Sequence, residues 1–228
     1  MDDQAIERIL AACEEELDTG RKADLRTLGF WRAVAAVKRR TERIDRFADR
    51  IAAIDREAFQ RRVRLIAPIQ VGVMLVFGGL FVDAWFLGAA AASEAPLREI
   101  LVLVGGIGML VATHGIAHFI VGTFMRIRFT DWFLDVPRRP QPGFKIDYAT
   151  YLRASPRERA WMHASGAIVS KIVPFAVAGY AHVIGADRWV VVVMLAIGVV
   201  SIFTDAIFSV RSSDWKRYRR EMRYARST

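Results

Sequence analysis

Residues Leu65–Ala92 read LIAPIQVGVMLVFGGLFVDAWFLGAAAA, and this stretch decides the fold class. It contains a single charged side chain, Asp83. A helix needs about 20 apolar residues to cross a hydrocarbon layer of about 30 Å. A buried helix of a soluble protein is normally shorter and has a polar face. The stretch therefore predicts a transmembrane helix.

Three further segments have the same character: Ile100–Phe124, Met162–Gly185 and Trp189–Val210. The chain of 228 residues is 54% hydrophobic and 25% charged, and the charges lie between the apolar segments. One cysteine, Cys13, excludes a disulfide-stabilised scaffold. We therefore predict an all-α, polytopic membrane protein with four transmembrane helices.

Basic residues predict the orientation of these helices. Of 33 Lys and Arg residues, 15 lie in 1–64, 8 in 125–161 and 7 in the tail from Arg211, whereas the other two connections hold one each. The positive-inside rule then places both termini and the middle loop in the cytoplasm, with the spans in the cell inner (plasma) membrane. The basic runs are interleaved with acids and contain no nucleic-acid-binding module, so the net charge of +9 does not indicate nucleic acid.

The pattern predicts three regions: a cytoplasmic helical region (1–64), a four-helix transmembrane domain (65–211) with a cytoplasmic loop (125–161), and a basic cytoplasmic tail (212–228). Apolar residues at three- and four-residue steps predict an amphipathic N-terminal helix through Ile44, Phe47, Ile51, Ile54 and Ala58. This region is interpreted as a helical hairpin on the membrane or on the bundle, or as a partner-binding segment.

Shorter signals mark other elements. Asp24 is placed to cap a second N-terminal helix that runs through Leu25 and Val37. Residues 126–135 fit a short strand or an interfacial stretch, and Ser155 with Pro156 fits the start of the helix that enters the third span.

Ionisable residues inside the spans are costly and therefore informative. They are Asp83, His114, His118, Lys171, His182 and Asp205. Counting about 1.5 Å per residue from the basic inner flanks places His114, His118 and Asp205 at overlapping depths in the inner half of the membrane. Asp83, Lys171 and His182 lie at other depths in the membrane.

His114 and His118 are four residues apart, so one helix face presents both imidazoles. This spacing offers two ligands to a tetrahedral metal ion, and Asp205 is at the right depth to supply a third. Two alternatives stay open: neutral histidines that hydrogen-bond across the bundle, and an ion pair between Asp205 and Lys171.

Three stretches resemble motifs of the site-2 protease family of intramembrane zinc metalloproteases. THGIAHFIVGTFMRIRF (113–129) resembles the H-E-x-x-H motif, and SPRERAWMHASGAIVSKIVPF (155–175) resembles the approach to a later span. SIFTDAIFS (201–209) resembles the span that carries the third ligand. The similarity covers roughly residues 98–211.

The resemblance implies a site-2-protease-like core with zinc bound by His114, His118 and Asp205. Gly115 stands where the family has its catalytic Glu, so the chain resembles a degenerate member without a general base. The resemblance therefore implies that the chain has no catalytic residue. It also implies that the protein is a pseudoprotease, or a membrane binding or regulatory protein. The expected partners are the lipid bilayer and a transmembrane protein or peptide, and a homo-oligomer stays open.

Two other functions fit parts of this sequence. A small transporter or channel would line a polar path with Asp83, Lys171, His182 and Asp205. A haem protein would need axial ligands from two helices, for which His118 and His163 are the candidates.

Overall fold

A computed structural model describes residues 1–20, 24–135, 139–207 and 213–227, without the side chains of 139–141, 205–207 and 227. The chain is mostly helical and divides into two compact units. Unit 1 comprises Met1–Ile69, Gly122–Arg159 and Glu221–Thr228, and unit 2 comprises Gln70–Val121 and Ala160–Arg220. The two units are described separately.

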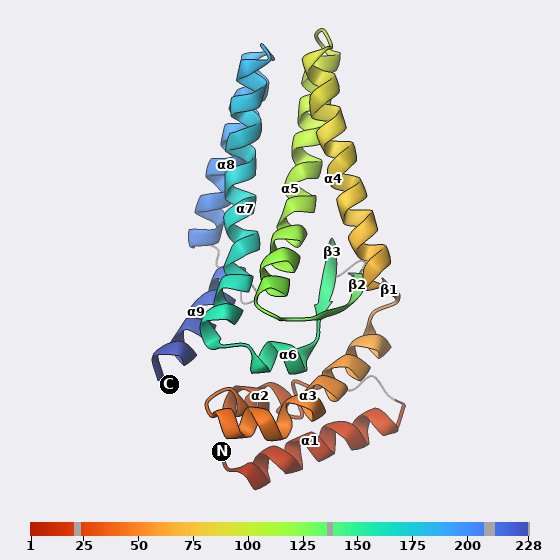
Figure 1. Ribbon diagram of the computed structural model, residues 1–228, viewed down its shortest axis with the longest axis vertical. Helices are drawn as coiled ribbons and strands as arrows, with labels where there is room; N and C mark the ends of the chain where they lie inside the picture. Colours follow the sequence, from red (N-terminus) through yellow and green to blue (C-terminus); the bar gives the residue numbers. More distant parts are fainter. Residues whose placement is uncertain (21–23, 136–138, 208–212, 228) are drawn as a thin grey trace. The chain divides into compact units, whose positions relative to one another are not determined.

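The N-terminal part of unit 1, shown in Figure 1, contains the helices α1 (Asp3–Asp18), α2 (Phe30–Val37) and α3 (Thr41–Arg62). These helices share one apolar core. Each contributes residues at helical spacing. The fully buried ones include Ile6, Leu10, Cys13, Phe30, Val37, Ala48 and Ile51. Ion pairs such as Arg50–Glu14, with Nη2 2.6 Å from Oε2, join the rims of α3 and α1.

The predicted amphipathic face of α3 is confirmed, since Phe47, Ile51 and Ile54 are buried in this core. The predicted start of the second helix is wrong. Asp24 caps a separate turn, where its Oδ1 accepts a hydrogen bond from the backbone N of Arg26 at 3.0 Å. Gly29 follows with φ of 83°, a left-handed conformation that helical residues do not adopt, so α2 begins only at Phe30.

Unit 1 also contains a three-stranded antiparallel sheet, ordered β1 (Leu65–Pro68), β2 (Phe129–Asp135) and β3 (Arg139–Ile146). The expectation of an all-helical chain is therefore wrong at these residues, although the possible strand at 126–135 is confirmed. The Phe133 ring packs edge-on against Phe59 of α3 with centroids 5.0 Å apart. A short helix, α6 (Tyr148–Arg153), follows β3.

A buried charge cluster ties further elements into unit 1. Glu221, which is 0% exposed, binds Lys38 Nζ at 2.6 Å and Arg159 Nε at 2.8 Å, and accepts a hydrogen bond from the Tyr151 hydroxyl at 3.2 Å. Burial raises the pKa of Glu221, but the charges of Lys38 and Arg159 outweigh it and lower the pKa to about 2.

Unit 2 contains the long apolar helices α4 (Ile69–Ala91), α5 (Leu97–Phe124), α7 (Pro156–Val183) and α8 (Arg188–Ile207), drawn in Figure 1. Three of them, α4, α5 and α7, are long and apolar enough to cross a membrane. The helix α8 is apolar over its described residues, Arg188–Thr204. Only 6% of the most apolar part of α4 is buried, which suits a helix that faces lipid.

Small residues let these helices approach closely. A Cβ added at Gly108 would lie 2.0 Å from Asp83 Oδ1, so α5 can accept the Asp83 carboxylate of α4 only because Gly108 has no side chain. The four helices also share a second apolar core. Its central residues, one from each helix, are Leu87, Val102, Ala181 and Met194.

Two helix starts position the site. The helix α7 begins with a capping box: Ser155 Oγ accepts from Glu158 N at 3.3 Å, and Glu158 Oε2 accepts from Ser155 N at 2.7 Å. This confirms the predicted start at Ser155 and Pro156. The last helix, α9 (Asp214–Ser227), begins after Ser213, whose Oγ accepts from Lys216 N at 3.4 Å.

Candidate metal centre

Three side chains of unit 2 converge on one point: His114 and His118 of α5, and Asp214 in the first turn of α9. The two histidine Nε2 atoms are 3.3 Å apart. Asp214 Oδ2 lies 3.3 Å from Nε2 of His118 and 3.4 Å from Nε2 of His114. The three ligand atoms thus form a nearly equilateral triangle.

Hydrogen bonds at the other ring nitrogens fix the tautomers of both histidines. His118 Nδ1 lies 2.6 Å from the Met162 carbonyl oxygen, which only accepts, so Nδ1 carries the hydrogen. His114 Nδ1 lies 2.8 Å from Ser170 Oγ, and that hydroxyl donates its own hydrogen to the Gly166 carbonyl at 2.8 Å. His114 Nδ1 is therefore also a donor, and both neutral rings present an Nε2 lone pair.

The centre thus brings together three acceptors, two imidazole lone pairs and one carboxylate oxygen. Three acceptors at 3.3–3.4 Å repel one another unless a cation lies between them. The side chains of His118 and Asp214 are each 17% exposed, so water screens this repulsion only partly. A proton on one histidine or a metal ion would supply the positive charge.

Helix α7 provides the space for the His118 ring. A Cβ added at Gly166 would lie 2.3 Å from His118 Nε2, far inside van der Waals contact. The ring can therefore lie against α7 and reach the Met162 carbonyl only because residue 166 is glycine. Buried outer contacts of this kind orient metal-binding histidines.

Asp214 is held in its ionised form. Burial raises the pKa of Asp214, but a histidine of this centre that carries a hydrogen on Nε2 donates a hydrogen bond to the carboxylate, and this bond, the charge of that histidine and the charge of Arg217 lower the pKa more. The pKa of Asp214 therefore lies well below its usual range. Arg217 Nη1 lies 3.6 Å from Oδ1, which leaves Oδ2 to face the histidines.

The other predicted polar residues do not join this group among the side chains that the structure describes. Asp83 lies on α4 against Gly108, Lys171 lies in α7, and His182 is exposed in the last turn of α7. The side chain of Asp205, the predicted third ligand, lies outside the described residues.

Asp214 was not predicted as a ligand because it lies in the basic tail, outside the apolar segments from which ligands were expected. A signal was present in the basic tail. Residues 211–228 contain seven basic residues and only two acids, Asp214 and Glu221, which lie seven residues apart on one helix face. Both acids are inward: Asp214 faces the histidines and Glu221 is buried.

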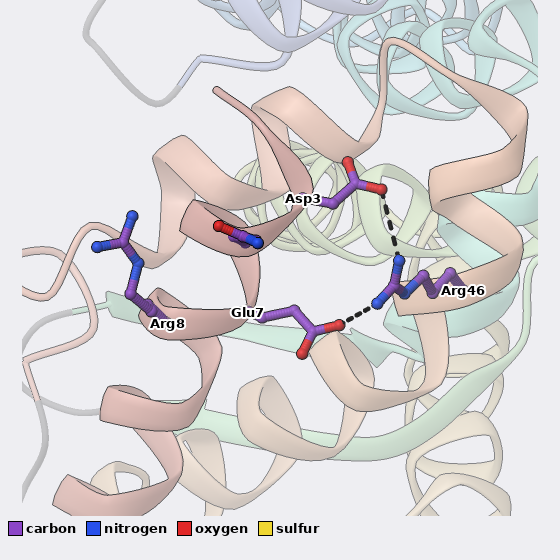
Figure 2. Close-up of a pocket in the computed structure, with 5 residues that line it drawn as sticks. Asp3, Glu7, Arg8 and Arg46 are labelled. Carbon is purple, nitrogen blue, oxygen red and sulfur yellow. Dashed lines mark hydrogen bonds and ion pairs between the residues drawn. The ribbon is translucent and has the colours of Figure 1, made fainter.

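A separate hollow of about 560 Å³ lies on the surface of unit 1, lined by residues of α1 and α3. In Figure 2, Arg46 bridges Asp3 and Glu7, while Arg8 points away from this pair. The Arg46, Asp3 and Glu7 side chains are 57%, 42% and 44% exposed, so these ion pairs are well solvated. Such surface pairs are typical of structural contacts between helices.

Comparisons of the chain with protein-family models, curated proteins and solved structures found no match. The centre formed by His114, His118 and Asp214 therefore has to be interpreted from its own geometry and chemistry.

Proposed function

We propose that the protein is a multi-pass membrane metalloprotein that binds zinc through His114, His118 and Asp214. The triangle of ligand atoms is the observation that carries the proposal. A tetrahedral zinc site with metal–ligand bonds of about 2.0–2.1 Å separates its ligand atoms by about 3.3–3.4 Å. The three separations at this centre are 3.3, 3.3 and 3.4 Å.

The donor set also fits zinc. Two neutral imidazoles and one carboxylate are ordinary zinc ligands, and both imidazoles donate Nδ1–H to an oxygen acceptor, as metal-binding histidines do. Three protein ligands leave a fourth position for water or for an oxygen atom of a bound partner.

A binding or regulatory role fits this centre better than proteolysis. Peptide hydrolysis at a zinc site needs a general base beside the metal, and Gly115 occupies the position that the resemblance assigns to that base. Among the described side chains, no further carboxylate groups with the three ligands. We therefore propose a pseudoprotease whose zinc site binds a transmembrane protein or peptide.

The proposed topology has four spans, with α8 as the fourth, both termini in the cytoplasm and the spans in the plasma membrane. Large apolar side chains exposed on α8 support this, among them Val192, Val200 and Phe203 at 62%, 56% and 59% exposure. The distribution of basic residues supports the orientation.

Metal analysis of the purified chain tests the proposal. We expect about one zinc per chain in the wild type, and loss of the metal in His118→Ala and Asp214→Asn, because each change removes one of three ligands. Asp205→Asn is the matched control: it makes the same change nine residues earlier and should retain zinc. Retention by Asp214→Asn together with loss by Asp205→Asn would instead support the ligand set inferred from sequence.

A cleavage assay tests the absence of proteolysis. The zinc-loaded protein is mixed with a model transmembrane peptide in detergent, and mass spectrometry follows its products. We expect no cleavage above the level of Asp214→Asn, because general acid–base help of about 10²–10⁴-fold in rate is missing. Cleavage by the wild type that Asp214→Asn abolishes would show that the protein is an active protease.

A further inference from the structure

Among the described side chains of α9, those that are exposed are all basic. They are Lys216, Arg219, Arg220, Arg223 and Arg226. They recur at steps of three or four residues, so they form one stripe along about 15 Å of helix. This set is called the basic stripe below.

No acidic residue interrupts the basic stripe. The two acids of α9 both lie on its other face, where Asp214 belongs to the metal centre and Glu221 is fully buried. The basic stripe therefore lies on a face of α9 to which the helix itself contributes no acidic residue. A face of this kind attracts a polyanion or an anionic surface.

Two features favour a membrane surface over other anions. The helix begins only seven residues after the end of the apolar helix α8 at Ile207, so it starts close to the end of a hydrophobic segment. Aromatic side chains that prefer the lipid–water interface accompany it: Tyr218 packs edge-on against Trp215 and Trp161, with centroids 5.6 and 5.9 Å away. Polybasic helices beside a membrane segment bind anionic headgroups.

We propose that the basic stripe of α9 binds the headgroups of anionic phospholipids in the leaflet that borders this helix. Lys and Arg side chains extend their charged ends toward phosphate groups while their aliphatic parts stay near the helix. The inference does not depend on the metal centre, because the stripe lies on the opposite face of α9 from Asp214 and Glu221.

Hydrogen–deuterium exchange of the full chain in lipid nanodiscs tests this proposal. Nanodiscs of phosphatidylcholine alone are compared with nanodiscs that contain 30% phosphatidylglycerol. We expect slower exchange at residues 213–227 with phosphatidylglycerol, by tenfold or more, and loss of this difference at high salt, where the Debye length falls to about 3 Å.

Three sets of variants identify the stripe as the cause. The triple change Arg219→Gln, Arg223→Gln, Arg226→Gln should remove the effect of phosphatidylglycerol, whereas the same residues changed to Lys should preserve it, because the charge is retained. The matched control is Arg8→Gln, Arg26→Gln, Arg32→Gln, which removes three exposed charges from the N-terminal region and should leave the effect intact. Circular dichroism verifies that each variant is folded.

Three outcomes would overturn the proposal: equal protection in the two lipid mixtures, an unchanged effect in a folded Gln variant of the stripe, or the same loss in the control triple. Protection of α9 by single-stranded RNA in phosphatidylcholine nanodiscs, with no effect of phosphatidylglycerol, would assign the stripe to nucleic acid instead. If the Gln variant of the stripe does not fold, the Lys variant provides the test. Loss of the phosphatidylglycerol effect in the folded Lys variant would contradict binding by charge.

Discussion

Glu221 is a residue whose ionisation should govern the stability of unit 1. It is fully buried between Lys38 and Arg159, and each of these partners is itself less than 5% exposed. Glu221→Gln would leave two buried cations without their counter-ion. Breaking a buried ion pair by removing one partner typically costs about 3–5 kcal/mol. We expect a comparable loss in the free energy of unfolding, measured by chemical denaturation in detergent.

The same residue predicts a pH dependence with a definite sign. Its pKa falls from an ordinary 4.5 to about 2 in the folded chain, so the charged form is stabilised by folding. The stabilisation is fully present above pH 4.5 and is lost as the pH falls toward 2. Glu221→Gln should lack this part of the acid dependence, and the exposed Glu15→Gln should retain it. An identical acid profile in wild type and Glu221→Gln would contradict the role of this cluster.

Of the three side chains in the candidate metal centre, the sequence predicted His114 and His118 and missed Asp214. The spacing of His114 and His118 is a local property of one helix, so it can be recognised without a structure. The partner acid cannot be found in this way, because Asp214 follows His118 by 96 residues and lies in a different helix. Depth in the membrane favours Asp205 as the third ligand. Depth alone gives no information on which helices are neighbours, so it cannot identify the correct acid.

At the scale of elements, the approach of α5 to α7 depends on Gly166. Gly166→Ala would place a Cβ 2.3 Å from His118 Nε2 and force the ring away from the Met162 carbonyl. Because loss of such an orienting contact weakens metal affinity by about 10–100-fold, we expect a decrease of at least tenfold. Titration with zinc against a competing chelator measures it.

The matched control for this prediction lies in the same helix. Gly179→Ala adds the same methyl group to α7 at a position with no neighbouring atom within 4 Å. It should leave zinc affinity unchanged and slightly stabilise the helix. Equal affinity in Gly166→Ala and the wild type would show that the ring position of His118 does not matter for metal binding.

The elements that sequence predicted least well are the strands. In the sheet order, β1 and β3 are both edge strands, with β2 between them. Edge strands tolerate proline, so Pro68 at the end of β1 and Pro140 and Pro142 in β3 are compatible with strand pairing. The sequence predicts residues 65–68 as part of the first span, because a four-residue strand gives no distinct pattern at the start of an apolar run.

For the whole molecule, labelling with a membrane-impermeant maleimide in intact cells tests the number of spans. Glu94→Cys and Asp187→Cys, in the connections with few basic residues, should react from outside. Arg39→Cys and Arg157→Cys should not. Arg226→Cys distinguishes four spans from three, because the tail lies on the outer side if α8 does not cross.

The native thiol does not interfere with this experiment. Cys13 is 0% exposed, and burial, followed by the charge of Glu14, raises its pKa to about 11. A thiol with that pKa contains little reactive thiolate at neutral pH. Labelling of Arg226→Cys from outside would contradict the fourth span, and labelling of Arg39→Cys from outside would contradict the orientation.

Because the three ligand residues are far apart in the sequence, they are synthesised at different times. Asp214 is synthesised 96 residues after His118, which takes about 5–20 s at ordinary rates of translation. During that interval a growing chain contains both histidines but no third ligand. A shortened chain that stops before residue 214 never completes the set. Zinc occupancy would therefore report, for each molecule, that synthesis has passed beyond the last apolar helix and that α9 has folded back to its place.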